Sequence, residues 1–137
     1  MTRSFLSPDT IIEGEVEGSI LSPGVRVAPG ARVLNSIIMH DCHIEAGAFL
    51  DRVIVDKRVR IGEKARIEGR GTLPNREFPK HLSEGLTLIG KGASIPPNMQ
   101  VLGNTIIRPW VEASDFPDMV VQEGETIRKG VINEGDF

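Results

Sequence analysis

Residues 16 to 67 read VEGSILSPGVRVAPGARVLNSIIMHDCHIEAGAFLDRVIVDKRVRIGEKARI, and the apolar residues of this stretch recur at a fixed step of seventeen. Three columns follow the step: Val16, Val33, Leu50 and Ile67; Val27, Ile44 and Ile61; and Leu21, Ile38 and Val55. A fixed period is typical of a repeat architecture and takes precedence over local secondary-structure preferences. The interpretation of the remaining chain therefore starts from this repeat.

Within one period, the leading apolar residue returns after five or six residues, as in Val27, Val33, Ile38 and Ile44. Six residues make one short strand and one tight turn, so three such units form a triangular coil whose leaders point inward. The pattern predicts an all-β fold, a parallel β-helix of hexapeptide repeats. The alternative is a β-sandwich of short strands, which does not require a seventeen-residue register in three columns.

Smaller residues also keep the register. An alanine column occupies the position where the triangle narrows at a corner and larger side chains would be strained; it consists of Ala31, Ala48 and Ala65. Gly or Asn stands three residues after several leaders, where a turn needs a positive φ; examples are Gly30, Gly47, Gly92, Asn98 and Asn104. Cys42 falls between Val25 and Val59 in another column, which predicts that it packs in the core.

Length and composition predict one domain and exclude several functions. A chain of 137 residues can bury a core without disulfides or metals. The net charge is −3, and aromatic residues make up 4% of the chain with no Tyr, so neither nucleic acid nor an anionic membrane is an expected partner. We find no apolar run typical of a signal peptide or a membrane span and expect a cytoplasmic protein.

The register divides the single domain into five parts. Residues 70 to 85 lack leaders and are rich in turn formers and charge, which indicates a loop that leaves the stack, and such loops often carry function. The Pro96-Pro97 pair cannot donate backbone hydrogen bonds and should lie at a corner. The bulky Trp110 and Phe116 lie in a Pro-broken stretch that should cover the last coil or a neighbouring domain, with a short helix within residues 110–115. The expected parts are an N-terminal cap at 1–15, coils at 16–71, a loop at 72–88, a resumed coil at 89–104 and a C-terminal cover at 105–137.

No catalytic constellation can be assembled from these residues. Hexapeptide acyltransferases use a histidine as general base, and His81, on the expected loop, is the one candidate, whereas His40 and His43 should face solvent or a neighbour. The γ-class carbonic anhydrases hold a metal through histidines about one coil apart; His40 and His43 are three residues apart, so no metal site is expected. No cofactor is expected either.

Basic residues at two coil corners are the candidates for a binding site. Lys57 and Arg58 follow Asp56 at one corner, and Lys91 stands at the corner of the resumed coil. One hypothesis is an anion site for a phosphorylated metabolite, in which Lys supplies a point charge and Arg a bidentate fork. The alternative is that these side chains serve only as solvated surface charge.

Several of these segments resemble a known family. Ser19 to Val27, Ser36 to Met39 and Val53 to Gly62 are similar to the C-terminal β-helix of ADP-glucose pyrophosphorylase, glucose-1-phosphate adenylyltransferase. The serine-proline-glycine and isoleucine-valine-aspartate-lysine segments are the more specific parts. The resemblance implies a left-handed coil, a non-catalytic domain with a role in oligomer contacts and allosteric control, and an N-terminal nucleotide-binding domain as partner.

The resemblance gives the first of three hypotheses for function, and the β-helix architecture gives the other two. The first is the regulatory and oligomerisation domain of a sugar-nucleotide pyrophosphorylase of glycogen or starch synthesis, as a fragment or a stand-alone relative. Plant members place activator-contacting lysines in segments similar to those around Lys57 and Lys91, although the glycines beside Lys91 and the loop at 70–85 depart from that pattern. The others are a stand-alone acyltransferase that uses His81 and a structural module that assembles with copies of itself.

Overall fold

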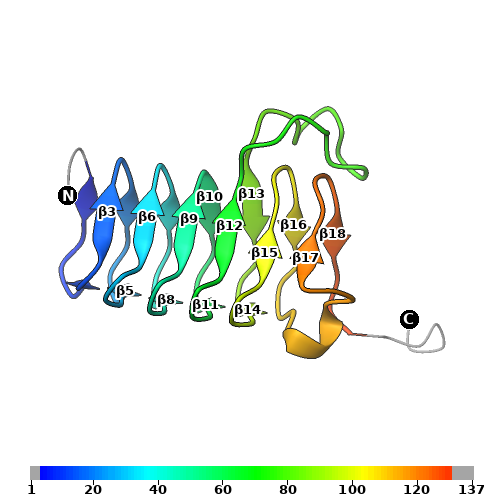
Figure 1. Cartoon of the computed structure of the whole chain (residues 1–137). Helices are drawn as coiled ribbons and strands as arrows, with labels where there is room; N and C mark the ends of the chain where they lie inside the picture. The colour runs from blue at the N-terminus through cyan, green and yellow to red at the C-terminus, as the bar shows by residue number, and fades with distance from the viewer. Residues whose placement is uncertain (1–3, 131–137) are drawn as a thin grey trace.

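The computed structural model describes residues 4–130, which form a straight stack of short parallel strands (Figure 1). The described strands make three sheets, one for each side of a triangular coil, as the repeat predicted. The seven-stranded sheet contains β1 (Phe5–Leu6), β4 (Ile20–Leu21), β7 (Ile37–Ile38), β10 (Val53–Val55), β13 (Thr87–Ile89), β16 (Ile106–Ile107) and β18 (Thr126–Ile127). The five-stranded sheet contains β2 (Ile11–Ile12), β5 (Arg26–Val27), β8 (His43–Ile44), β11 (Arg60–Ile61) and β14 (Ser94–Ile95). The six-stranded sheet contains β3 (Glu15–Glu17), β6 (Arg32–Leu34), β9 (Phe49–Asp51), β12 (Arg66–Glu68), β15 (Gln100–Val101) and β17 (Val120–Val121).

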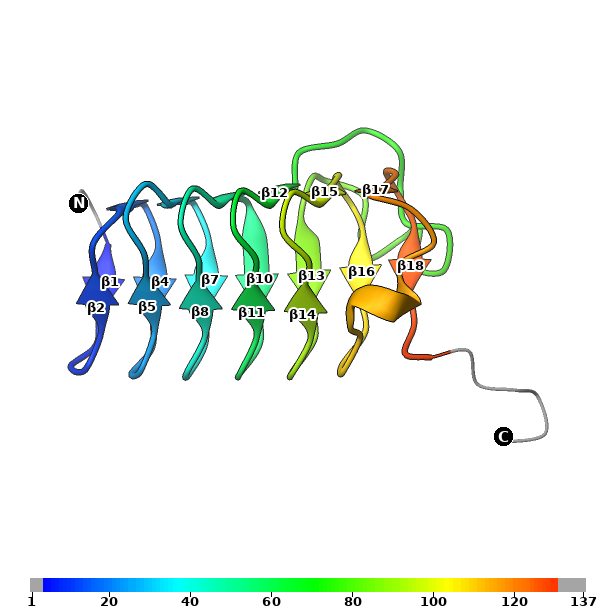
Figure 2. The same cartoon turned by 60° about the horizontal axis from the view of Figure 1, so that its bottom comes forward.

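The coil is left-handed, as the resemblance implied. Followed from the N-terminus in Figure 1, the chain rises along the front row of strands and returns behind it. Figure 2 shows the same stack with its lower, five-stranded side turned toward the viewer. This handedness is opposite to the usual right-handed crossover between parallel strands.

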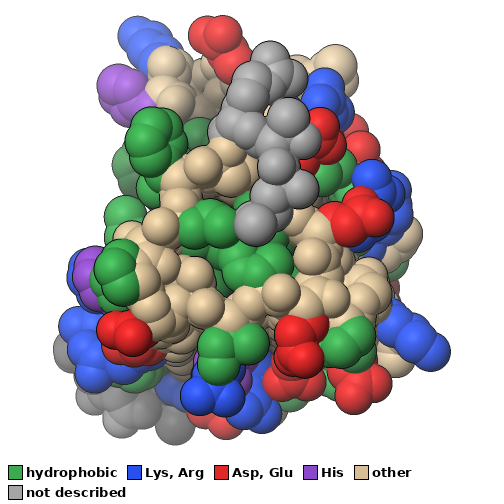
Figure 3. All heavy atoms as spheres, turned by 90° about the vertical axis from the view of Figure 1, so that its left-hand side faces the viewer, with side chains coloured by type: hydrophobic (Ala, Val, Ile, Leu, Met, Phe, Trp, Pro, Cys, Tyr) green, Lys and Arg blue, Asp and Glu red, His purple; other side chains and the backbone are tan. Residues whose placement is uncertain are grey.

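The core lies inside the triangle and consists of the predicted columns. Val33 pairs with Leu50 and Leu50 with Ile67, and each of these side chains is fully buried. The alanine column and Cys42 are also fully buried, which confirms that they pack in the core. In the end view of Figure 3, hydrophobic side chains occupy the centre, and the rim carries the charged side chains together with further hydrophobic ones.

The turns use the left-handed backbone region at equivalent corners of successive coils. Gly30, Gly47 and Asn98 have positive φ there, as predicted. Asp41, Arg58 and other non-glycine residues also adopt a positive φ at corners, with values of 59° and 56° for these two. Pro96 and Pro97 lie between the end of β14 and β15, outside any strand, which confirms the corner assignment.

The excursion loop lies between β12 and β13 and spans residues 69 to 86 in the structure. Partners on either side of it, such as Val55 and Ile89, are thirty-four residues apart, whereas Ile38 and Val55 are seventeen apart. The loop therefore takes up one period of sequence without adding a coil. β13 begins at Thr87, so the last residues assigned to the loop at 72–88 belong to the stack.

The two ends of the stack differ from the sequence-based division. Residues 5–15, expected as a cap, form the first coil, because β1, β2 and β3 pair with β4, β5 and β6. The expected cover at 105–137 instead supplies β16, β17 and β18, which extend the sheets. A single 3-10 turn, η1 (Ala113–Asp115), falls within the predicted helical stretch. Phe116 packs against the core beside it. The expectations for residues 1–3 and 131–137 lie outside the described residues.

Candidate functional site

The predicted basic residues lie at the corner between the seven-stranded and five-stranded sheets. Lys57 and Arg58 form the turn between β10 and β11, and Lys91 lies in the turn between β13 and β14. Because Val55 pairs with Ile89, these turns belong to adjacent coils, which stack about 4.8 Å apart. Lys57 and Lys91, separated by thirty-four residues, are therefore neighbours.

Backbone hydrogen bonds lock the turns of this corner onto one another. The Gly92 N–H donates to the Lys57 carbonyl at 2.9 Å, and the Arg58 N–H donates to the His40 carbonyl at 2.9 Å. The Trp110 N–H continues the ladder to the Lys91 carbonyl at 2.9 Å. The corner is thus a preorganised surface whose side chains are held at coil spacing.

Gly92 allows the ring of Trp110 to pack closely against the turn that contains Lys91. Its φ is +70°, and a Cβ on it would lie 2.3 Å from the ring of Trp110. The indole of Trp110, which is 55% exposed, therefore covers the backbone beside Lys91. This close packing is a local structural reason for Gly92, one of the glycines that depart from the family pattern.

The electrostatic environment of the corner is mixed but mainly basic. Register places Arg108 in the same turn one coil beyond Lys91, since Ile89 pairs with Ile107. Two acidic residues share the corner. Asp56 Oδ1 accepts the Lys57 N–H at 2.7 Å and lies 3.5 Å from Lys57 Nζ, and Asp41 occupies the turn one coil before Arg58. Lys57 and Arg58 are exposed and Lys91 is half-buried, so these cations remain accessible to a dissolved anion.

A shallow apolar groove of about 220 Å³ borders the corner on the seven-stranded side. Ile54, Leu88 and Ile106 form its floor, and Asp56 and Arg108 stand at its edge. The corner can therefore offer ammonium and guanidinium groups to a phosphate, with apolar side chains beside it on the seven-stranded sheet.

His81 lies on the excursion loop, away from this corner, and its side chain is exposed. The backbone N–H of His81 donates to the backbone carbonyl of Phe78 at 3.1 Å. Within residues 4–130 the imidazole makes no hydrogen bond or ion pair, so no carboxylate or carbonyl orients it. A general base usually needs such a partner to fix its tautomer.

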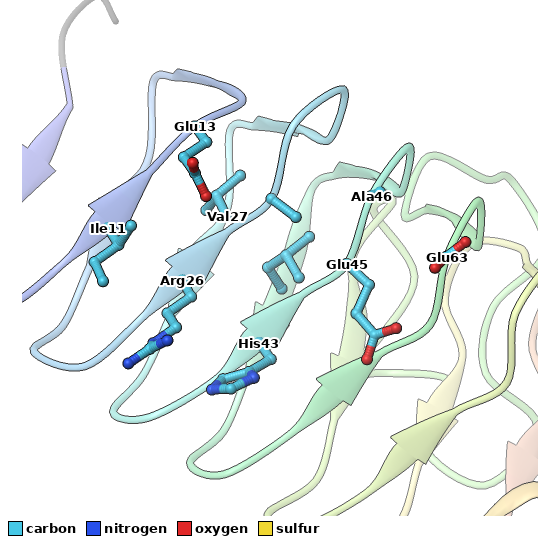
Figure 4. A pocket seen from close by; sticks show the side chains of 10 residues that line it. Ile11, Glu13, Arg26, Val27, His43, Glu45, Ala46 and Glu63 are labelled. Atoms are coloured by element: carbon cyan, nitrogen blue, oxygen red, sulfur yellow. The ribbon is translucent and has the colours of Figure 1, made fainter.

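The structure also contains a groove, lined by charged and apolar side chains, that the sequence did not single out. It has a volume of about 450 Å³ and lies on the five-stranded sheet, where Arg26 and His43 project from adjacent strands and Glu13, Glu45 and Glu63 follow at the turns (Figure 4). The sequence predicted only that His43 faces solvent or a neighbour. Its seventeen-residue spacing from Arg26 and from Arg60 was the available signal. Among the described residues, no group of three or more His, Cys, Asp or Glu side chains is arranged to hold a metal ion.

The excursion loop is fixed to the stack by polar contacts. Arg70 Nε donates to Asp51 Oδ2 at 2.9 Å, and the same carboxylate accepts a hydrogen bond from Asn35 Nδ2 at 3.1 Å. The bond to Asp51 raises the pKa of Arg70. At the other side of the loop, Glu123 accepts the N–H groups of Thr72 and Leu73, which lower the pKa of its carboxyl.

Cys42 takes no part in these surfaces. Burial raises the pKa of its thiol to about 11, and its Sγ donates to the Asp56 carbonyl at 2.9 Å. A thiol with so high a pKa is almost entirely protonated at neutral pH and is a poor nucleophile.

Comparison with known proteins identifies the family of the coil. The family model described as GlmU-like, C-terminal hexapeptide, matches residues 1–89. The chain belongs to the GlmU-like C-terminal hexapeptide family. Residues that carry the repeat make up most of this match, and the excursion loop lies within it.

Curated relatives of this GlmU-like chain agree with the resemblance to ADP-glucose pyrophosphorylase. A glucose-1-phosphate adenylyltransferase of Acetivibrio thermocellus is 30% identical over 128 residues, which are 93% of this chain and 30% of the relative. A glucose-1-phosphate adenylyltransferase of Thermomicrobium roseum is 47% identical over 94 residues, which are 68% of this chain and 22% of the relative. The chain thus spans less than a third of the length of these relatives.

Among solved structures, the GlmU-like fold is shared with the acetyltransferase domain of PglB from Neisseria gonorrhoeae. The TM-score is 0.59 at 18% identity, and the match covers 95% of this chain and 51% of that domain. At this identity the likeness concerns the fold alone. In residues 4–130, no helix is long and apolar enough to cross a membrane.

Proposed function

We propose that this chain is a regulatory and oligomerisation region of a sugar-nucleotide pyrophosphorylase that makes ADP-glucose from glucose 1-phosphate and ATP. The similarity to glucose-1-phosphate adenylyltransferases along 93% of the chain supports this assignment. In the proposal, nucleotidyl transfer takes place in an N-terminal nucleotide-binding domain of the whole protein. The chain alone is therefore expected to release no pyrophosphate from ATP and glucose 1-phosphate.

The regulatory part of the proposal places a phosphorylated-metabolite effector at the corner of Lys57, Arg58 and Lys91. The observation that carries it is the stacking of the Lys57 and Lys91 turns in adjacent coils. Two ammonium groups from neighbouring coils and a guanidinium can share one phosphate, the ammonium groups by point charge and the guanidinium by its fork. The arrangement needs no movement of the backbone, because the turns are already hydrogen-bonded to each other.

The test is ligand-dependent thermal stability. Fructose 1,6-bisphosphate, 3-phosphoglycerate and sulfate are titrated against the wild type, Lys57→Ala, Lys91→Ala and the control Lys64→Ala, which removes an exposed turn lysine from a different corner. At about a hundredfold excess over Kd, a phosphorylated ligand should raise Tm by several degrees in the wild type and the control. The rise should be lost in either corner variant. Equal shifts in all four proteins, or no shift in any, would contradict the effector site.

A stand-alone acyltransferase with His81 as general base is the competing hypothesis. It predicts saturable binding of acetyl-CoA and loss of activity in His81→Ala. A flat binding isotherm would remove it.

A further inference from the structure

The seven-stranded sheet carries an apolar row on its outer surface. Parallel pairing places the outward residue of each strand directly above that of the strand before, so the row runs the length of the stack. It consists of Phe5, Ile20, Ile37, Ile54, Leu88 and Ile106, and ends at Thr126. Phe5 is 77%, Ile20 46% and Ile37 37% exposed, and Ile54, Leu88, Ile106 and Thr126 are half-buried. We call these seven residues the apolar row.

The other two faces of the coil have a different character. The outward residues of the five-stranded sheet are Ile11, Arg26, His43, Arg60 and Ser94, and those of the six-stranded sheet include Glu15, Arg32, Phe49, Arg66 and Gln100. On the latter, Arg66 lies 4.2 Å from the centroid of the Phe49 ring and Arg32 pairs with Glu15 at 3.1 Å. Outward positions of this coil are thus usually charged or polar, and the apolar row is specific to one face.

The core of the coil does not require these side chains. The inward residues of the same strands, such as Leu21, Ile38 and Val55, fill the interior and are fully buried. A contiguous apolar surface that solvent reaches and that the fold does not need is typical of an interaction site. An exposed row of β-branched and aromatic residues on a sheet is also an aggregation hazard unless it is covered.

The shape of the outer surface of the seven-stranded sheet indicates which partner can bind there. The stack runs straight in both Figure 1 and Figure 2, and seven strands spaced about 4.8 Å apart present a flat strip about 30 Å long. A second strip with the same spacing can interdigitate with it along its whole length, as identical side chains do where sheets stack in a dry zipper. Another copy of this chain carries such a strip by construction.

The area of this surface is close to the area that each partner buries in a stable dimer. The row with its flanking turns is about 30 Å by about 20 Å, on the order of 600 Å², which approaches the roughly 800 Å² per partner of a standard stable interface. Both faces would contribute isoleucines, so the core of the contact would be as apolar as homodimer interfaces are.

We propose that the apolar row packs face to face against the apolar row of a second copy of this chain. The proposal deepens the assembly part of the function proposed above and rests on it. A two-fold pairing superposes the middles of the two rows. β10 is the fourth of the seven strands, so Ile54 meets the partner subunit's Ile54 whether the two coil axes run parallel or antiparallel.

The first test measures mass by light scattering across a concentration series. The wild type should give about twice the 15.0 kDa of the chain. Ile37→Lys should weaken the pairing roughly tenfold or more, because it buries an unpaired ammonium in the interface. The control Gln100→Lys places the same charge at an exposed outward position of the six-stranded sheet and should leave the mass unchanged. A monomer at every concentration, or an assembly that Ile37→Lys does not weaken, would overturn the proposal.

The second test is a disulfide between copies. Ile54→Cys should form a covalent dimer under mild oxidation, whereas Gln100→Cys should not, and the buried Cys42 contributes little background. Equal crosslinking of the two variants would also overturn the face-to-face arrangement.

The Ile37→Lys protein separates this proposal from the effector proposal. Lys57 and Lys91 are intact in it, so an anion-dependent rise in Tm that persists without pairing reports on the corner alone. Pairing without any anion effect would leave the apolar row supported and the effector site refuted.

Discussion

The coils at 16–67 and the excursion at 69–86 are stabilised in different ways. Each coil repeats the same inward columns, so its stability is spread over many small apolar contributions, such as those of Leu50 and Ile61, both fully buried. The excursion has few buried apolar side chains, with Leu82 as its main one at 6% exposure. It is held instead by single polar anchors that occur once in the chain.

Two asparagines are the main anchors. Asn75 and Asn104 are fully buried, and Asn75 Nδ2 donates to the Asn104 carbonyl at 3.1 Å. Asn104 in turn accepts the Gly85 N–H at 2.9 Å and donates to the Leu73 carbonyl at 2.9 Å. The coils are therefore stabilised by apolar burial that every period repeats, whereas the loop depends on a few particular hydrogen-bonded atoms.

The largest expected effect lies in the coils. Leu50→Ala removes a fully buried side chain from the middle of a column and should lower the free energy of unfolding by about 2–5 kcal/mol, through lost burial and a residual cavity. Urea denaturation measures the change. Ile11→Ala, at an outward position that is 46% exposed, is the control and should cost about 0.5 kcal/mol. Similar costs for the two variants would contradict a core confined to the interior of the triangle.

The next largest expected effect concerns the stability of the excursion loop alone. Asn104→Ala leaves the N–H of Gly85 and the carbonyl of Leu73 unsatisfied and should cost about 1–3 kcal/mol more than Asn98→Ala. Asn98 is a suitable control because it has a similar φ, 63° against 57°, but is exposed in a different turn.

Limited proteolysis reports where the stability is lost. Asn104→Ala should be cleaved first within residues 70–86, and Asn98→Ala should show the wild-type pattern. Uniform cleavage along the whole stack would mean that the loop and the coils unfold as one unit.

The smallest effect concerns pH. The N–H groups of Leu73 and Thr72 hold the pKa of Glu123 below its ordinary value of 4.5. Because this pKa is lower in the folded state, the contact stabilises the loop above pH 4.5 and is lost as the pH falls through the folded pKa. Amide chemical shifts of Thr72 and Leu73 should therefore change on acidification. Glu123→Gln should remove that change, and Glu63→Gln, at an exposed turn, should keep it.

The periodicity of the sequence was enough to predict the fold because every inward column advances by seventeen in the regular coils. The coils at the two ends were not predicted, because paired residues there are not seventeen residues apart, although their strands pair in the same parallel way. Leu6 pairs with Leu21 fifteen residues on, and Val101 pairs with Val121 twenty residues on. The longer spacing accommodates the turn that contains η1, which a search for one fixed step overlooks.

The candidate site was predicted as separate residues and not as a cluster. Sequence placed Lys57 and Lys91 at corners, but the period taken up by the loop concealed that they lie in adjacent coils. The polar anchors at Asn75 and Asn104 are tertiary contacts without a repeat, so no pattern indicated them. The apolar row also follows the seventeen-residue step, through Ile20, Ile37 and Ile54, but the step alone does not distinguish an outward column from an inward one.

The central claim is that a phosphorylated metabolite binds at the corner of Lys57 and Lys91. It is tested most directly by titrating fructose 1,6-bisphosphate into isotope-labelled protein and following backbone amide chemical shifts. The account predicts saturable changes centred on residues 56–58 and 90–92, in the two stacked turns. Changes centred on the groove around Arg26 and His43, or no saturable change, would contradict it.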